Sequence, residues 1–236
     1  MQAAVGGALH PERLLSSMPT TARPALTSRS NGRLSREDWI VAARRALVSG
    51  GIANVKIDRL ADQLGASRGS FYWHFSSHSE LLEALVESWA RTNSEAFLRI
   101  LESDTDDPAA QFRNFVDVWV KERDFDPAYD NAMRDWARKS PHVKKLLHRA
   151  DEVRMGALRS IFDAMGYEPL EAEIRARVTY YHQVGYYALQ IREPPQTRRK
   201  LFATYLKVLS GLSIERFADG DRIAGIAGKR GRTKHR

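Results

Sequence analysis

The sequence contains no cysteine. This absence excludes disulfides and thiolate metal sites, and it is typical of proteins that stay in a reducing compartment. No run of about 18 apolar residues is present, so we expect no helix that spans a membrane. The start of the chain also lacks the basic and then apolar pattern of a signal peptide. We therefore expect a cytoplasmic protein with no membrane partner.

Catalytic patterns are absent as well. The sequence has no phosphate-binding loop, no nucleophile paired with a base and no paired carboxylates at a useful spacing. His74 and His78 are four residues apart, a spacing that can bind zinc on a helix, but no third ligand is near them. We therefore expect neither an enzyme nor a bound metal or other cofactor.

Positive charge is in excess. The 236 residues include 37 Lys and Arg against 29 Asp and Glu, a formal net charge of +8. Such a balance indicates an anionic partner, either nucleic acid or a membrane surface, or simply a solvated basic surface. Hydrophobic residues make up 43% of the chain, which is enough for a substantial folded core.

The periodicity of the chain is helical and predicts an all-α fold. No alternating pattern of convincing length indicates a strand. Beyond the N-terminal third, prolines stand near the starts of apolar stretches with helical spacing. The expected helices there are 109–123, 128–138, 141–165, 169–191 and 196–217.

Both ends of the chain have the composition of disordered segments. Residues 1–32 are rich in Ala, Ser, Thr, Gly and Pro, and we expect a disordered arm. Residues 218–236 combine glycines with late basic residues, and we expect a basic disordered tail. This tail either contacts DNA phosphates or only solubilises the chain.

The segment 57–75 predicts two short helices joined by a tight turn. Gly65 suits the turn because glycine adopts positive φ without strain, and Ser67 stands where an N-cap belongs. Phe71 and Phe75 are four residues apart, so they share one face and anchor the second helix to a core. Together with a helix that begins at Ser35, these elements predict a helix-turn-helix domain over 33–80.

The opposite face of the second helix is polar and aromatic. Arg68 can bond the edge of a guanine, the Ser70 hydroxyl suits several bases, and Tyr72 can donate to a phosphate. Trp73 can pack on a thymine methyl or a sugar, and Gly69 gives the backbone close access. This is the arrangement of a helix that enters the major groove of double-stranded DNA by its N-terminus.

Residues 35–89 resemble the DNA-binding domain of the TetR family of bacterial transcriptional regulators. The resemblance rests on four stretches, which are Gly50-Gly51, IDRLADQLG (57–65), SRGSFYWHF (67–75) and Leu81-Leu82. It implies a homodimer that binds a palindromic operator. The expected DNA-binding residues are Lys56, Ser67, Arg68, Gly69, Ser70, Tyr72, Trp73, His74 and His78.

One position departs from the family pattern. The family often has a lysine at the start of the fourth helix, where it binds a phosphate, but this chain reads Ser76-Ser77-His78-Ser79. Backbone N–H groups at that helix start can still hold a phosphate. His78 contributes little charge at neutral pH.

The resemblance also implies that 81–217 is a helical effector-binding and dimerisation domain. Most aromatic and methionine side chains in it belong to the core. Some of them are expected to line a cavity for a small apolar or aromatic effector, together with polar groups such as Gln183. The candidate effector-binding residues are Trp119, Met133, Trp136, Met155, Tyr181 and His182.

Two late stretches carry more apolar surface than one core requires, VTYYHQVGYYALQI (178–191) and LFATYLKVLSGL (201–212). Either they are buried within the subunit, or two such helices from each subunit form a four-helix dimer interface, as the family resemblance favours. Gly185 would permit close helix approach in such an interface.

The sequence thus predicts a ligand-responsive, sequence-specific transcriptional regulator, a repressor that a small-molecule effector releases from DNA. The alternative is a DNA-binding architectural protein of the same fold that responds to a protein partner and binds no metabolite. A C-terminal domain without a cavity would favour that alternative.

Overall fold

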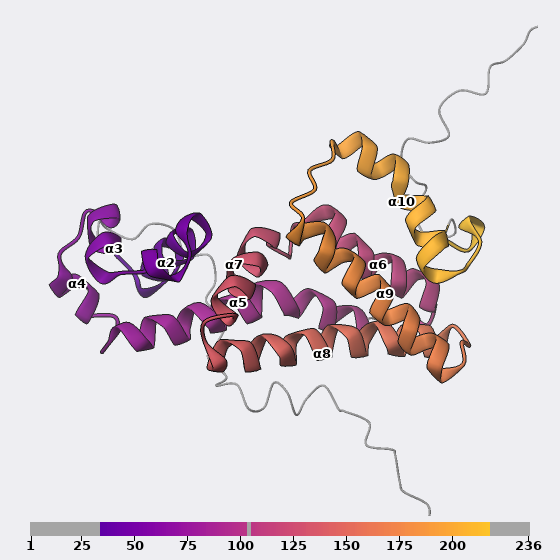
Figure 1. Cartoon of the computed structure of the whole chain (residues 1–236), viewed down its shortest axis with the longest axis horizontal. Helices are drawn as coiled ribbons and strands as arrows, with labels where there is room; N and C mark the ends of the chain where they lie inside the picture. Colours follow the sequence, from indigo (N-terminus) through magenta and orange to yellow (C-terminus); the bar gives the residue numbers. More distant parts are fainter. Residues whose placement is uncertain (1–33, 103–104, 218–236) are drawn as a thin grey trace, which may run out of the picture. The chain divides into compact units, whose positions relative to one another are not determined.

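The computed structural model describes residues 34–102 and 105–217, and within these residues the chain is all-α with no strand (Figure 1). The expected fold class is therefore confirmed. The predicted arm, 1–32, and the predicted tail, 218–236, lie outside the described residues.

Nine α-helices are present in the described part of the chain. They are α2 (Arg36–Gly50), α3 (Ile57–Leu64), α4 (Arg68–Tyr72), α5 (His78–Leu101), α6 (Pro108–Lys121), α7 (Pro127–Ala137), α8 (Pro141–Ala164), α9 (Pro169–Ala188) and α10 (Pro195–Ser210). Two short 3₁₀ turns, η1 (Ile52–Asn54) and η2 (Ile214–Phe217), complete the structure. Each helix from α6 to α10 begins with a proline, because proline has the φ of a first helical residue and needs no hydrogen-bond acceptor there.

The chain forms two compact units. The N-terminal unit contains residues 34–91 with Ala128–Arg149, and the C-terminal unit contains Thr92–Pro127 with 150–217. The helices α5 and α8 each contribute to both. The N-terminal unit therefore includes α7 and the start of α8 besides the segment 33–80 expected from the sequence.

Helix boundaries in the N-terminal unit follow local signals. Ser35 caps α2 as predicted: its Oγ accepts from the Asp38 N–H at 3.3 Å, and the Asp38 carboxylate accepts from the Ser35 N–H at 2.8 Å. Gly65 ends α3 in the left-handed region, with φ 63° and ψ 34°. The predicted turn between α3 and α4 is thereby confirmed.

An aromatic cluster holds α4 against α2. Trp39, Phe71 and Phe75 have at most 1% of their surface exposed. The Phe71 ring meets Trp39 edge-on at 5.3 Å and stacks with Phe75 at 5.3 Å between centroids. The predicted anchoring role of Phe71 and Phe75 is confirmed.

Hydrogen bonds fasten α7 to the first part of α5 in the same unit. The Tyr129 hydroxyl donates to the Leu85 carbonyl at 2.6 Å, and the Trp89 indole N–H donates to Asp130 at 3.2 Å. Arg134 pairs with the same carboxylate at 2.9 Å. These bonds satisfy polar groups that would otherwise be buried at a cost.

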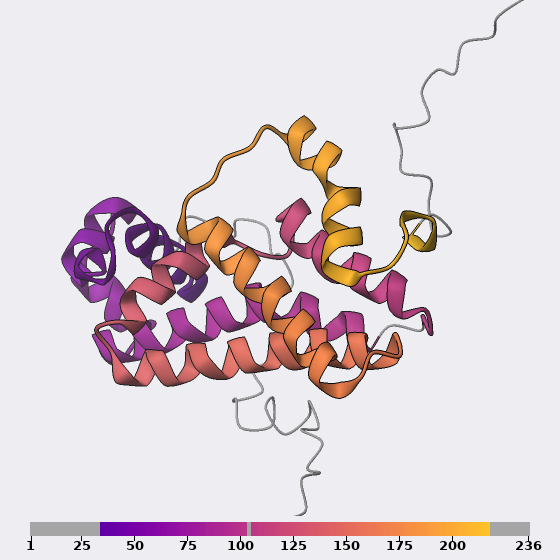
Figure 2. The same cartoon turned by 45° about the vertical axis from the view of Figure 1, so that its right-hand side comes forward.

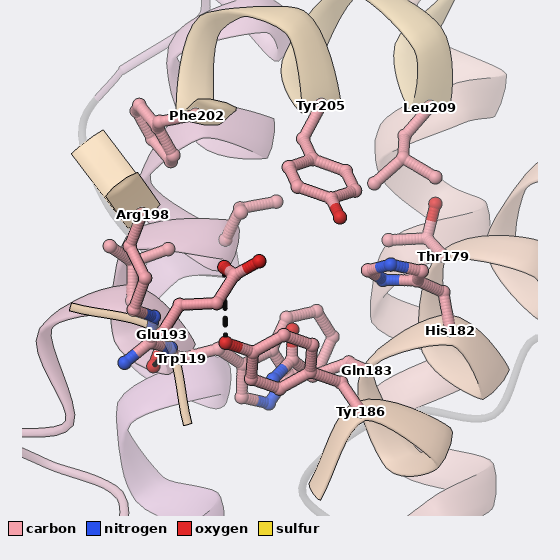
Figure 3. A pocket seen from close by; sticks show the side chains of 12 residues that line it. Trp119, Thr179, His182, Gln183, Tyr186, Glu193, Arg198, Phe202, Tyr205 and Leu209 are labelled. Atoms are coloured by element: carbon pink, nitrogen blue, oxygen red, sulfur yellow. Dashed lines mark hydrogen bonds between the residues drawn. The ribbon is translucent and has the colours of Figure 1, made fainter. Parts of the chain in front are cut away.

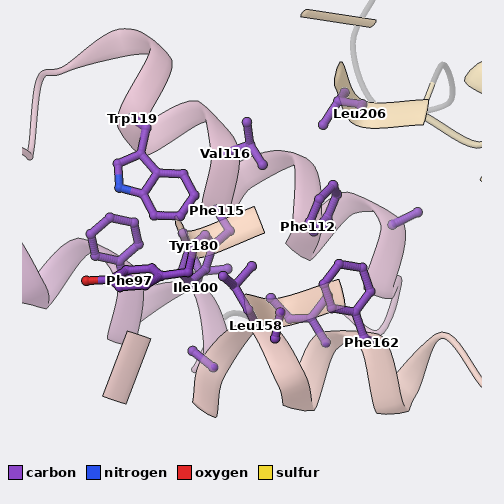
Figure 4. Packing of buried hydrophobic residues seen from close by; sticks show 14 of the residues in the cluster. Phe97, Ile100, Phe112, Phe115, Val116, Trp119, Leu158, Phe162, Tyr180 and Leu206 are labelled. Atoms are coloured by element: carbon purple, nitrogen blue, oxygen red, sulfur yellow. The ribbon is translucent and has the colours of Figure 1, made fainter. Parts of the chain in front are cut away.

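The C-terminal unit has an aromatic core. Phe97 from α5 packs on Phe115 and Trp119 of α6, at 4.6 and 5.4 Å between ring centroids. Phe112 of α6 meets Phe162 of α8 at 5.1 Å, so three helices share one cluster (Figure 4). Figure 2 shows α5 and α8 running side by side.

A buried arginine joins three helices of the C-terminal unit. Arg154 on α8 is only 1% exposed, and its Nη2 donates to the Asn93 carbonyl at 3.0 Å on α5. Its Nη1 donates to the Tyr180 hydroxyl of α9 at 3.3 Å, and that hydroxyl donates to Asp151 at 2.5 Å. A buried charge of this kind is tolerated because hydrogen bonds and a nearby carboxylate replace water.

Gly65→Ala should destabilise the protein by about 1–2 kcal/mol, because a side chain in the left-handed region places Cβ too close to the backbone. Urea unfolding followed by circular dichroism measures this difference. Gly69→Ala is the matched control, since a Cβ at Gly69 would meet only the Ser67 Oγ, at 3.5 Å. Equal stability of the two variants would contradict the prediction.

Candidate functional site

The helix α4 presents one face to solvent. Ser67 caps it, accepting at its Oγ from the Ser70 N–H at 3.2 Å. Phe71 points into the core, whereas Tyr72 is 52% and Trp73 79% exposed. The structure thus has two large aromatic side chains on the surface immediately beside two buried ones.

An ion pair links α4 with α3 at this surface. The Arg68 Nε lies 3.2 Å from Asp58 Oδ1, and both side chains are more than half exposed. The pair keeps the guanidinium near the junction of the two helices without burying it. Sequence analysis missed Asp58, because its spacing from Arg68 follows no helical repeat and results from the turn between the helices.

His78 has a structural contact. Its Nε2 lies 2.7 Å from the carbonyl oxygen of Val55, the second residue before α3. The ring therefore ties the start of α5 to the start of α3. It remains a predicted DNA-binding residue, but its ring is directed at a backbone carbonyl of the same unit.

The capping interactions at the start of α5 are divided between two serines. Ser77 Oγ accepts from the Glu80 N–H at 3.2 Å. The Glu80 carboxylate instead accepts from the Ser76 N–H at 2.7 Å. That backbone bond is the main reason why the pKa of Glu80 is lowered, with the Ser76 hydroxyl and Arg36 adding to it.

The nine residues predicted to bind DNA lie within one segment of 23 residues in the N-terminal unit. Six of them are exposed and three, which lie on α4, just after it and at the start of α5, are partly buried. The exposed ones are Lys56, Ser67, Arg68, Gly69, Tyr72 and Trp73, and the partly buried ones are Ser70, His74 and His78.

The C-terminal unit contains a cavity of about 50 Å³ between α6, α9 and α10 (Figure 3). This volume holds only a few water molecules. The α6 wall consists of Val116, Trp119 and Val120. The α9 wall consists of Thr179, His182, Gln183 and Tyr186. The remaining lining residues are Glu193, Arg198, Phe202, Tyr205 and Leu209.

Two polar atoms of the α9 wall lack a hydrogen bond. Within the part of the chain that the structure describes, neither Thr179 Oγ1 nor Gln183 Nε2 has a hydrogen-bond partner. Thr179 is only 1% exposed. Because an unpaired buried polar group is costly, these atoms favour a ligand or water that would satisfy them.

Charged groups lie at one end of the cavity. Arg198 Nη1 pairs with Glu122 at 2.9 Å, and Arg198 Nη2 donates to the Trp119 carbonyl at 3.3 Å. Burial opposes the charge of Arg198, but its hydrogen bond and attraction to Glu122 outweigh burial and raise its pKa. The Tyr186 hydroxyl donates to Glu193 at 3.3 Å.

His182 lies at the rim of the cavity, opposite these charges. Part of its ring reaches solvent, yet the desolvation of the rest lowers the pKa of the imidazole. Its ring centroid lies 5.0 Å from that of Tyr205 on α10. This shift favours the neutral form of the imidazole at the rim.

The six predicted effector-binding residues lie in different places. Trp119 and His182 both line the cavity. Met155 packs against the core of the C-terminal unit, and Tyr181 is 56% exposed. Met133 and Trp136 are buried in the N-terminal unit and do not join the cavity.

Sequence analysis missed the α10 side of the cavity, because it considered 201–212 only as part of the subunit core or of a dimer interface. The spacing of Arg198, Phe202, Tyr205 and Leu209, which is four, three and four residues, was the available signal.

The outer face of α9 is apolar and exposed. Ile174, Val178 and Tyr181 follow each other at helical spacing and are 49%, 53% and 56% exposed. Gly185 continues the row, and a Cβ built on it would meet nothing within 4 Å. We call this row of residues, Ile174–Val178–Tyr181–Gly185, the α9 outer face.

Residues 34–102 and 105–217 contain neither a candidate metal site nor a candidate membrane span. Among these residues, no group of three or more His, Asp or Glu side chains could hold a metal ion. Over the same ranges, none of the helices combines the length and the apolar character that crossing a bilayer requires.

Sequence comparison relates the helix-turn-helix segment to known proteins. Residues 40–85 match the family described as bacterial regulatory proteins, tetR family. The chain is 32% identical over 82 residues to the HTH-type transcriptional regulator TtgR of Pseudomonas putida, covering 35% of this chain and 39% of that protein. It is 26% identical over 129 residues to EthR of Mycolicibacterium smegmatis, covering 55% and 59%. The match to TtgR thus spans about two fifths of that protein's length.

Solved structures share the fold over most of the chain. A TetR transcription regulator from Haloarcula marismortui superposes with a TM-score of 0.52 at 21% identity, covering 77% of this chain and 95% of that one. A transcriptional regulator from Aquifex aeolicus superposes with a TM-score of 0.55 at 16% identity, covering 74% and 98%. The helix-turn-helix segment is thus similar in sequence to the tetR family of bacterial regulatory proteins, and the all-helical fold is similar to that of solved transcriptional regulators.

Proposed function

We propose that the protein is a sequence-specific DNA-binding transcriptional regulator that acts as a homodimer. The observation that carries this proposal is the two-sided helix α4. Phe71 is fully buried, while Arg68, Tyr72 and Trp73 are exposed around it. Exposed tryptophan and arginine side chains add little to the packing of a helix against its own core. A helix that enters the major groove, in contrast, uses such side chains to contact DNA.

The surface of α4 supports a division of roles. Arg68, in the first turn, would contact a base edge, and the short side chains of Gly69 and Ser70 would let the backbone approach the groove. Tyr72 would donate to a phosphate. His78 is bonded to Val55 and the Ser76 N–H to Glu80, so phosphate contact depends more on Tyr72 and Lys56.

The α9 outer face supports a dimer. About half of the surface of Ile174, Val178 and Tyr181 is exposed in the single chain, which is unusual for neighbouring apolar side chains on a helix. Burial against the same face of a second chain would remove this surface from water. A two-fold dimer would place two copies of α4 roughly 34 Å apart, to match a palindromic operator.

The cavity favours control by a small molecule over control by a protein partner. Its unpaired Thr179 and Gln183 atoms are the kind of groups that a ligand satisfies. We propose repression that is relieved when a ligand binds the DNA-incompatible state of the dimer more tightly than the DNA-bound state. Catalysis is no part of this proposal.

Selection of bound fragments from genomic DNA, followed by footprinting, tests the proposed function directly. The expected result is protection of a site with two-fold symmetry, with a centre-to-centre half-site spacing of about one or more DNA turns. Equal affinity for all fragments, at several salt concentrations, would rule out sequence-specific binding.

Arg68→Ala should weaken binding to the selected site by about 1–3 kcal/mol and relax sequence preference at one position of each half-site. Fluorescence anisotropy with the site and its single-base variants measures both effects. Arg99→Ala is the control: it removes the same charge from an exposed pair, Arg99–Glu95, in the C-terminal unit. If both variants lose the same affinity, Arg68 has no specific contact.

Tyr72→Phe should weaken binding to all DNA sequences alike, by about 1 kcal/mol, because only a hydroxyl bond to phosphate is lost. The phenylalanine ring keeps the edge contact that Tyr72 makes with Phe71 at 5.2 Å. Unchanged affinity, or a loss restricted to one sequence, would contradict a phosphate contact.

Val178→Asp should shift the protein from dimer to monomer, because the carboxylate would be buried unpaired in the interface. Sedimentation velocity at several concentrations measures the shift. Val48→Asp is the control, since Val48 is 40% exposed on α2, outside the α9 outer face. If only the control variant remains a dimer, the α9 outer face is supported as the interface. If both variants have the same oligomeric state, this interface is excluded.

A further inference from the structure

Glu193 gives the cavity a negative charge. Its side chain is partly buried in the segment between α9 and α10, and its carboxylate points into the cavity (Figure 3). The Tyr186 hydroxyl donates to it at 3.3 Å. Within the described chain, no lysine, arginine or histidine nitrogen lies within ion-pair distance of this carboxylate.

Arg198 does not neutralise Glu193. Its guanidinium is engaged with Glu122 at 2.9 Å and with the Trp119 carbonyl at 3.3 Å. Since Arg198 and Glu122 balance each other, the carboxylate of Glu193 leaves this end of the cavity with one uncompensated negative charge. An anionic ligand would be repelled there.

Aromatic rings surround the same space. Trp119, Tyr186, Phe202 and Tyr205 line the cavity, and Figure 3 shows Tyr205 and His182 pointing toward the space that the Glu193 carboxylate faces. The faces of aromatic rings attract cations, and the attraction grows when water is excluded. Carboxylate and rings together therefore form a site for a positive charge on an apolar body.

We propose that the effector is an organic cation, an amine or quaternary ammonium on an aromatic or aliphatic body. The positive group lies against Glu193 and the Tyr186 and Tyr205 rings, and the body lies between Trp119 and Phe202. The Thr179 hydroxyl and Gln183 amide bond a polar group elsewhere on the ligand. This inference rests on the proposed ligand control and specifies its chemistry.

The cavity must enlarge to admit such a ligand. Its volume of about 50 Å³ is well below the range of roughly 300–1,000 Å³ of pockets for drug-sized ligands. Residues 189–194, which join α9 to α10, contain no helix, so α10 can move away from α6 without breaking a helix. Ligand binding is thereby coupled to the position of α10.

Isothermal titration calorimetry of the full chain with three probes of matched shape tests the proposal. The probes are phenylbutylammonium, phenylbutanol and phenylbutanoate, which carry a positive, neutral and negative end group. Phenylbutylammonium should bind about tenfold more tightly than phenylbutanol, because one charge contact shielded from water can supply a difference of that size. Phenylbutanoate should bind most weakly.

Variants assign the preference to Glu193. Glu193→Gln should bring phenylbutylammonium to the affinity of phenylbutanol and leave the alcohol unchanged, and Glu193→Lys should favour phenylbutanoate. Glu168→Gln, an exposed glutamate before α9, is the matched control and should keep the wild-type preference. Circular dichroism melting confirms that each variant is folded.

The outcomes separate this inference from the proposed function. Equal or tighter binding of the alcohol or carboxylate, a preference that survives Glu193→Gln, or no binding of any probe overturns the cation site. DNA binding is measured separately with the selected site. If the wild-type protein does not bind the selected DNA, the proposed function is wrong. A cation preference that depends on Glu193 would still stand in that case.

Discussion

The arrangement of the N-terminal unit depends on one aromatic contact, that of Phe71 with Trp39 and Phe75. The helix α4 has only five residues, far fewer than an isolated helix needs to be stable in water. It persists because Phe71 is fully buried and the Ser67 hydroxyl caps its start. The exposed side chains of Arg68, Tyr72 and Trp73 keep their positions only while that contact exists.

The C-terminal unit divides into a well-bonded part and a loosely packed part. Arg154 connects α5, α8 and α9 through hydrogen bonds beside a dense cluster of rings. The helix α10, in contrast, borders a cavity with unpaired polar atoms on the opposite wall. Regions with incomplete packing and hydrogen bonding open most easily, so a ligand would act there with least resistance.

The sequence predicted what short-range interactions decide. Ser35, Gly65 and the prolines at helix starts determine local backbone geometry, so the helices and the turn between α3 and α4 were predictable. The Asp58–Arg68 pair and the grouping of Glu193 with Tyr186 arise from the folded arrangement. Likewise, the apolar character of Met133 and Trp136 indicated burial but could not indicate in which of the two units.

The two sides of α4 have a consequence for how such a protein can change over generations. Folding depends on the inward ring of Phe71, whereas the outward residues at 68, 69, 72 and 73 make few contacts that stability requires. Exposed substitutions usually alter stability by no more than about 0.5 kcal/mol. If α4 reads DNA as proposed, a new sequence preference would be accessible by single substitutions that leave the scaffold intact, which would make this helix an evolvable and re-engineerable element.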